Sequence, residues 1–152
     1  MKCQVQTIWT GVMGIMAGFD LLAKYYSGGD KHNESGERFV CFIKKYVSIN
    51  QSEIIYQLRN SLLHSFGLYS YKIIKDKQTK AETTIEWHFT LATNPNSQLV
   101  VIESKDHYRI DVLELHRLFE RSVDLFKKEY PTLNSYSKFK HFSDLYGWTK
   151  IG

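Results

Sequence analysis

The sequence predicts an α+β fold, mainly α, in which a small antiparallel sheet interrupts a bundle of four or five helices. Changes in the hydrophobic period carry this prediction. Large apolar residues recur every three or four positions up to about residue 65, alternate over 84–91, and return to the helical period after residue 111. The length of 152 residues fits one domain, so we expect a single domain over 1–152, with the strands as an insertion at about 70–104.

Composition and charge narrow the class of protein. Hydrophobic residues make up 43% of the chain and charged residues 24%, which excludes bulk disorder. A net charge of +4 permits contact with RNA or DNA, but proteins that coat nucleic acid are usually more basic. Cys3 and Cys41 form no C-x-x-C pair, so they predict neither a disulfide framework nor a zinc site. A reduced, cytoplasmic location is therefore expected.

The first predicted helix runs from Thr7 to Tyr26, with its large side chains on one stripe. The 17 residues from Cys3 to Phe19 carry no charge, which raises the alternative of a signal peptide or membrane span. Polar residues interrupt this stretch, and it is short for the roughly 30 Å of a bilayer core, so we interpret it as a buried helix and expect no membrane contact. Small residues also share one side of this helix, where they favour close approach of another helix. They are Gly11, Gly14 and Gly18.

Two more helices are expected before the strands. One covers about 36–47 and the next ends at about Ser65, with Gly67 after it. Either Asn50 or Ser52 is a candidate N-cap for this third helix.

Alternation predicts a half-buried strand over 84–91, with Trp87 facing inward. The side chains expected on its buried face are Ile85, Trp87, Phe89 and Leu91. Segments 71–75 and 98–103 are expected as its antiparallel neighbours, with a fourth short strand at 107–109.

The chain after the strands returns to helix. Asp111 and Glu114 have the spacing of a capping box at the start of a helix that reaches about Tyr130, before Pro131. A short terminal helix is expected over 136–146.

The end of the third helix carries the most informative polar residues, Arg59, Asn60 and His64. At 100° per residue, Asn60 and His64 lie on nearly the same face, whereas Arg59 and His64 lie about 140° apart. Their polar groups are therefore not expected to meet within one straight helix. A homodimer, in which Arg and His from two chains share a cleft, would bring them together.

The segment Leu58–Ser65, with Arg, four residues and then His, resembles the motif of HEPN domains, which lies on the third helix of a bundle of four or five helices. This resemblance implies a metal-independent endoribonuclease, without a cofactor, that leaves a cyclic 2′,3′-phosphate and a 5′-hydroxyl. It alternatively implies a non-catalytic dimeric module that binds RNA, a nucleotide or a protein partner. In the catalytic version, His64 acts on the ribose 2′-hydroxyl, Arg59 binds the scissile phosphate and Asn60 orients the phosphate or the histidine.

The chemistry of these side chains suits that reaction without reference to a family. Neutral imidazole takes up a proton near pH 7, and guanidinium binds phosphate through two parallel hydrogen bonds. A purely structural alternative stays open, in which Arg59 pairs with Glu53 or Glu34 and His64 is a hydrogen-bonded residue at the helix end. Ser61 is a further candidate substrate ligand.

Two other candidate ligands are Ser65, directly after the histidine, and Lys72, near Tyr69 and Tyr71. Lysine binds phosphate and tyrosine stacks on bases, although a lysine-rich edge strand also serves to discourage sheet pairing. The sequence contains no phosphate-binding loop, dinucleotide-binding fingerprint or H-E-x-x-H metalloprotease motif, and no metal site is expected.

Overall fold

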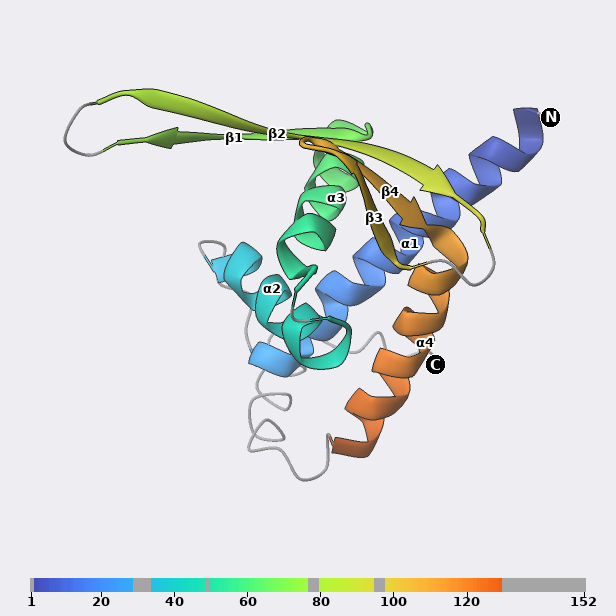
Figure 1. Cartoon of the computed structure of the whole chain (residues 1–152). Helices are drawn as coiled ribbons and strands as arrows, with labels where there is room; N and C mark the ends of the chain where they lie inside the picture. Colours follow the sequence, from blue (N-terminus) through green and yellow to red (C-terminus); the bar gives the residue numbers. More distant parts are fainter. Residues whose placement is uncertain (1, 29–33, 49, 77–79, 95–97, 130–152) are drawn as a thin grey trace, which may run out of the picture.

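The computed structural model describes residues 2–28, 34–48, 50–76, 80–94 and 98–129. Within these residues, helices dominate and a small sheet lies between the third and fourth helices, as predicted (Figure 1). The helices are α1 (Lys2–Ser27), α2 (Ser35–Tyr46), α3 (Ser52–Ser65) and α4 (Val112–Glu129). The strands are β1 (Tyr69–Lys75), β2 (Glu82–Ala92), β3 (Val100–Ser104) and β4 (His107–Asp111). The predicted terminal helix at 136–146 lies outside the described residues.

The core of the bundle forms around Phe19 of α1, which is fully buried. Its ring contacts the rings of Phe39 and Phe42 on α2 and of Phe119 on α4, with centroid distances of 6.5, 6.3 and 5.0 Å. The apolar stripe predicted on the first helix therefore faces the other helices, as expected. None of the described helices is both long and apolar enough to cross a membrane.

The glycine side of α1 is divided between two environments. At Gly18 an added Cβ would lie 2.6 Å from Cζ of Phe119, so the absent side chain lets α4 approach closely. At Gly11 and Gly14 an added Cβ would meet nothing within 4 Å. Within the described residues, only the Gly18 end of the strip is thus used for helix packing.

The sheet is mixed rather than purely antiparallel, which corrects the sequence prediction. Its strand order is β1-β2-β4-β3, and β4 runs parallel to β2. The physical reason is the tight turn at Lys105 and Asp106, which folds β4 back against β3 and inserts it between β3 and β2. The inserted strands also extend to Asp111, beyond the expected end near residue 104, because β4 leads directly into α4.

The alternating pattern of β2 is confirmed where the strand covers the helices. Trp87 and Phe89 are buried, with 7% and 6% of their surface exposed, whereas Ile85 is 37% exposed. Figure 1 shows the cause, since the hairpin of β1 and β2 extends past the helical bundle. None of the described helices therefore covers the outer half of the hairpin, which includes Ile73.

Two helix starts differ in how they are capped. Asp111 caps α4 as predicted, because its Oδ1 accepts a hydrogen bond from the backbone N–H of Glu114 at 2.8 Å. Its Oδ2 also accepts from the backbone N–H of Asn94 at 2.7 Å, which ties the helix start to the loop after β2. The Glu114 half of the predicted capping box is wrong, since its carboxylate accepts from Arg117 and the backbone N–H of Asp111 donates to the carbonyl oxygen of Leu99. At α3 the cap position belongs to Gln51, which makes no side-chain capping bond, so neither Asn50 nor Ser52 has the predicted role.

Candidate functional site

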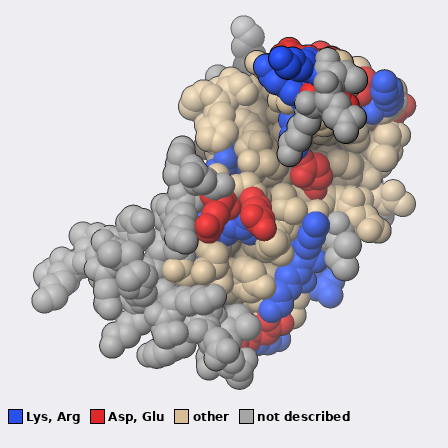
Figure 2. Space-filling view, turned by 90° about the vertical axis from the view of Figure 1, so that its left-hand side faces the viewer, with Lys and Arg blue, Asp and Glu red and all other residues tan. Residues whose placement is uncertain are grey.

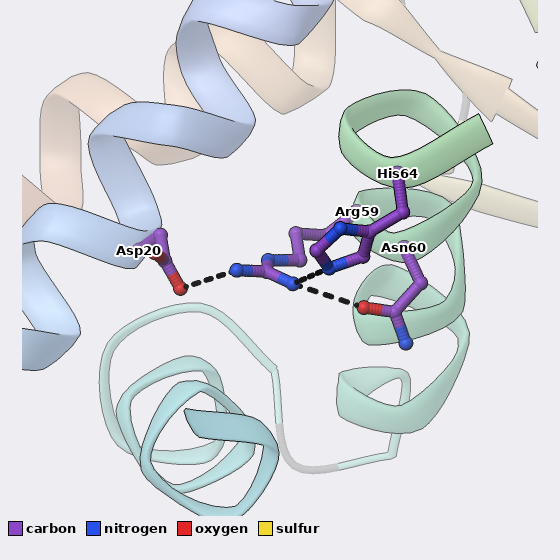
Figure 3. Close-up of polar contacts among 4 residues, drawn as sticks. All are labelled: Asp20, Arg59, Asn60 and His64. Atoms are coloured by element: carbon purple, nitrogen blue, oxygen red, sulfur yellow. Dashed lines mark hydrogen bonds and ion pairs between the residues drawn. The ribbon is translucent and has the colours of Figure 1, made fainter. Parts of the chain in front are cut away.

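The polar groups of Arg59, Asn60 and His64 meet at the end of α3 within one chain (Figure 3). Arg59 Nη1 lies 2.7 Å from His64 Nε2 and donates a hydrogen bond to Asn60 Oδ1 at 3.1 Å. The expectation that Arg59 and His64 would not meet is therefore wrong. Helical side chains lean toward the N-terminus of their helix, so the His64 ring tilts back over the preceding turn, where the long Arg59 side chain reaches it.

The ion-pair partner of Arg59 is Asp20 of α1, and not Glu53 or Glu34. Asp20 Oδ1 lies 3.1 Å from Arg59 Nη2, and the two side chains are 17% and 10% exposed. Glu53 instead accepts a hydrogen bond from Gln57 at 2.9 Å. Asp20 therefore supplies the counter-charge that a largely buried guanidinium requires.

The contact with Arg59 determines which tautomer the neutral His64 ring adopts. Guanidinium carries donors alone, so the contact at 2.7 Å requires His64 Nε2 to accept, and the proton of a neutral ring then lies on Nδ1. The Asn60 carbonyl faces Arg59, so its amide group points away from Arg59 (Figure 3). His64 Nδ1–H and the Asn60 amide are therefore donors available to an anion.

A groove of about 590 Å³ lies between α3 and the edge strand β1. Helix α3 and strand β1 each contribute polar and aromatic side chains to it. Its lining residues are Tyr56, Gln57, Asn60, His64, Ser65, Tyr69, Ser70, Tyr71 and Lys72. None of these lining residues carries a carboxylate, and Lys72 adds a positive charge, so the groove suits a negatively charged ligand.

The groove contains four of the six predicted site residues, namely Asn60, His64, Ser65 and Lys72. Arg59 lies behind it, and its guanidinium contacts the groove residues Asn60 and His64. Ser61 is fully buried and donates its hydroxyl hydrogen bond to the carbonyl oxygen of Leu58 at 2.8 Å. The structure thus places Ser61 outside the groove.

The Ser65 hydroxyl donates to the carbonyl oxygen of Ser61 at 3.0 Å, within its own helix. Near the hairpin, Lys75 pairs with Glu82 at 2.6 Å, and Figure 2 shows basic and acidic atoms next to each other on this side of the molecule. Lys72 lines the groove, whereas Lys75 lies outside its lining and pairs with Glu82, so Lys72 is the better candidate for binding a ligand there.

Sequence reasoning missed Gln57, Ser70 and Asp20. Gln57 lies three residues before Asn60 and seven before His64, so the helical period alone could have placed it on their face. The Ser70 hydroxyl donates to Gln57 Oε1 at 2.9 Å, which joins β1 to α3 at the groove. Asp20 had a weaker signal, since it directly follows the buried Phe19 at the edge of the apolar stripe.

Comparison with known proteins gives no match: no family model, no curated protein and no solved structure is similar to this chain.

Proposed function

We propose that this protein is a metal-independent endoribonuclease of the HEPN type, acting through Arg59 and His64 in a single domain. The observation that carries the proposal is the convergence of Arg59, Asn60 and His64 beside a groove without carboxylates. A base and an anion-binding guanidinium both accelerate cleavage of RNA by its own 2′-hydroxyl, and Lys72 adds a positive charge to the same groove.

The proposed reaction is a transfer of the phosphoryl group within the RNA. The ribose 2′-oxygen attacks the adjacent phosphorus as its bond to the 5′-oxygen breaks. The departing 5′-oxygen takes a proton from water, which leaves a cyclic 2′,3′-phosphate and a 5′-hydroxyl. A phosphate oxygen is a better acceptor for Arg59 Nη1 than neutral imidazole is, because the resulting hydrogen bond joins two charged groups. Binding of the phosphate therefore releases His64 Nε2, which takes the proton of the 2′-hydroxyl.

The remaining groove residues would bind the rest of the phosphate backbone. The amide of Asn60 donates to a phosphate oxygen, and Lys72 lies on the opposite side of the groove, where it binds a neighbouring phosphate. Ser65 is placed to contribute a further hydroxyl.

A second candidate is a non-catalytic module of the same type, which binds RNA, a nucleotide or a protein partner through this groove. The observation that favours it is the low exposure of Arg59, whose side chain is 10% exposed and held by Asp20. An arginine with this surrounding can serve the fold alone, as the structural interpretation of the motif expects.

We also infer a homodimer in a cytoplasmic setting. The support for the dimer comes from α1, where Gly11 and Gly14 leave a side of the helix free of neighbours among the described residues. Sedimentation at micromolar concentration tests it, since a dimer gives twice the chain mass of 17.8 kDa. A Gly14→Arg variant that sediments as the wild type would contradict a contact at this position.

The activity is tested with single-stranded RNA in EDTA, comparing the wild type with His64→Ala and Arg59→Lys. We expect cleavage that survives the chelator and leaves cyclic phosphate ends. Loss of the base should slow it by about 10²-fold or more, about 2.7 kcal/mol of barrier. Arg59→Lys keeps a positive charge beside Asp20 but has a single side-chain nitrogen. It therefore lacks the second nitrogen that would bind phosphate while the first stays paired with Asp20, so it should also be slower.

His116 provides the matched control, because its side chain is 58% exposed on α4 and pairs with Glu120 outside the groove. His116→Ala should cleave at the wild-type rate. Intact RNA, or equal rates in His64→Ala and wild type, would show that the catalytic assignment is wrong. Salt-dependent RNA binding without cleavage would then favour the non-catalytic module.

A further inference from the structure

A stack of four rings crosses the face of the sheet that points away from the helices. Tyr69, His88 and His107 are directly paired across β1, β2 and β4, so their side chains share one face. The ring centroids of His88 and His107 lie 4.7 Å apart with planes 10° apart, and Tyr69 lies 4.8 Å from His88. The stack continues to Tyr71, at 6.0 Å from Tyr69.

Tyr71 ends this stack at the edge strand, beside the groove. It is 59% exposed and lines the groove that contains His64. Its neighbour Tyr69 is fixed by a hydrogen bond from its hydroxyl to Glu86 and by contact with His88. Tyr71 is therefore an exposed aromatic ring whose position is fixed by the rings stacked behind it. Because the ring is already held in place, less conformational entropy is lost when a flat ligand stacks on it.

Phe66 is a second exposed ring whose position the fold does not explain. It directly follows Ser65 of the groove, and it is 72% exposed. Its backbone is left-handed, with φ 49° and ψ 36°, a conformation that favours glycine at the end of a helix. Phe66 therefore contributes little stability through burial, and its backbone conformation is unfavourable for a side chain of this size. Strained backbone conformations of this kind are concentrated at functional sites.

The chemistry of the groove selects one kind of ligand for these rings. A lining without carboxylates, with Lys72 and amide donors, suits a polyanion. Exposed aromatic rings stack on nucleobases whose faces are free, as in single strands, whereas the bases of a duplex already stack on one another. Phosphates and unpaired bases occur together in single-stranded RNA.

We propose that Tyr71 and Phe66 are base-stacking positions that hold two unpaired bases of single-stranded RNA at the rim of the groove. The inference rests on the proposed action on RNA and adds to it the part of the substrate that is bound. Lys72 contacts the phosphate backbone between the rings and the groove. The β1–β2 hairpin then serves substrate binding, and α3 supplies the reacting groups.

The test measures binding of a fluorescent single-stranded RNA of roughly ten nucleotides by anisotropy, in a His64→Ala background in which cleavage is strongly slowed. Tyr71→Ser and Phe66→Gly should each weaken binding about tenfold or more, and Phe66→Trp should preserve it. Ile102→Ser is the matched control, because Ile102 is 66% exposed on β3 and lies outside the groove lining. It should bind as the His64→Ala parent does.

Phe66→Gly separates loss of stacking from loss of folding. Glycine is favoured in the left-handed region, so this variant should unfold at the same temperature as its parent or higher, while binding RNA more weakly. A duplex of the same sequence should bind more weakly than the single strand and should be insensitive to both ring substitutions.

The possible outcomes distinguish this inference from the proposed function. Unchanged affinity in Tyr71→Ser and Phe66→Gly overturns the stacking positions, and His64-dependent cleavage in the wild type would then leave the endoribonuclease proposal standing. Equal affinity for duplex and single strand also overturns the inference. If neither RNA binds to any variant and the wild type does not cleave RNA, both proposals are overturned.

Discussion

Replacing Asp20 with alanine should destabilise the protein by about 3 kcal/mol. Removing one partner of a buried ion pair costs about 3–5 kcal/mol, because the remaining charge stays buried without a partner. Asp20 and Arg59 are 17% and 10% exposed, so residual solvent contact places the expected cost at the low end. Urea denaturation followed by circular dichroism measures it as a lower transition midpoint with an unchanged slope.

A double-mutant cycle isolates the contact from other effects of the substitutions. Asp20→Ala and Arg59→Ala should couple by about 1.5 kcal/mol or more, because the two side chains are in direct contact. Glu82→Ala provides the comparison, since Glu82 pairs with Lys75 at 2.6 Å but the side chains are 53% and 72% exposed. That exposed pair should be worth about 0–1 kcal/mol. A cost at Asp20 no larger than at Glu82, or a coupling near zero, would refute the reasoning.

Two further perturbations test the packing and the charges of the bundle. Gly14→Ala should raise the free energy of unfolding by about 0.5–1 kcal/mol. Gly18→Ala should lower it by about 1 kcal/mol, because the added Cβ would meet the ring of Phe119. Shifts in melting temperature of the same sign for both variants would contradict this prediction. A hydrogen bond from Lys45 lowers the pKa of Glu129 below its ordinary value of 4.5, so the stability from this contact is present above that pH and is lost as the pH falls through the lower folded pKa. Glu129→Gln should therefore flatten the fall in melting temperature below about pH 4.5, and parallel curves would refute the role of this contact.

The helices and the buried part of β2 could be predicted because they depend on local periodicity. The pattern around Phe19 and Trp87 holds wherever another layer of the structure covers the element. It fails at Ile85, because alternation marks a face but cannot say whether a helix covers it. The parallel pairing of β2 with β4 could not be predicted from local periodicity either. It depends on the order of the strands in the sheet, in which β4 lies between β2 and β3.

The contacts of the candidate site could likewise be predicted where they lie within one helix and not where they join distant segments. Asn60 and His64 share a helix face through their spacing, and the structure places both in the groove. Asp20 lies 39 residues before Arg59, so its contact depends on how α1 packs against α3. The angular argument about Arg59 and His64 failed for another reason. The long Arg59 side chain covers part of the 140° arc, and the backward lean of the His64 ring, which the angle alone does not include, covers the rest.

Arg59 can keep its ion pair with Asp20 and still have the proposed catalytic role, because the two contacts use different nitrogens of the guanidinium. Asp20 engages Nη2, whereas Nη1 contacts Asn60 and His64, which both line the groove. In the proposed mechanism, a phosphate would replace the two neutral partners of Nη1 while the ion pair at Nη2 stays intact. This exchange would strengthen the bonds of Nη1, because a charged acceptor replaces neutral ones. Asp20 then acts as the residue that fixes the orientation of the guanidinium, so that phosphate binding costs little rearrangement and frees His64 Nε2 at the same time.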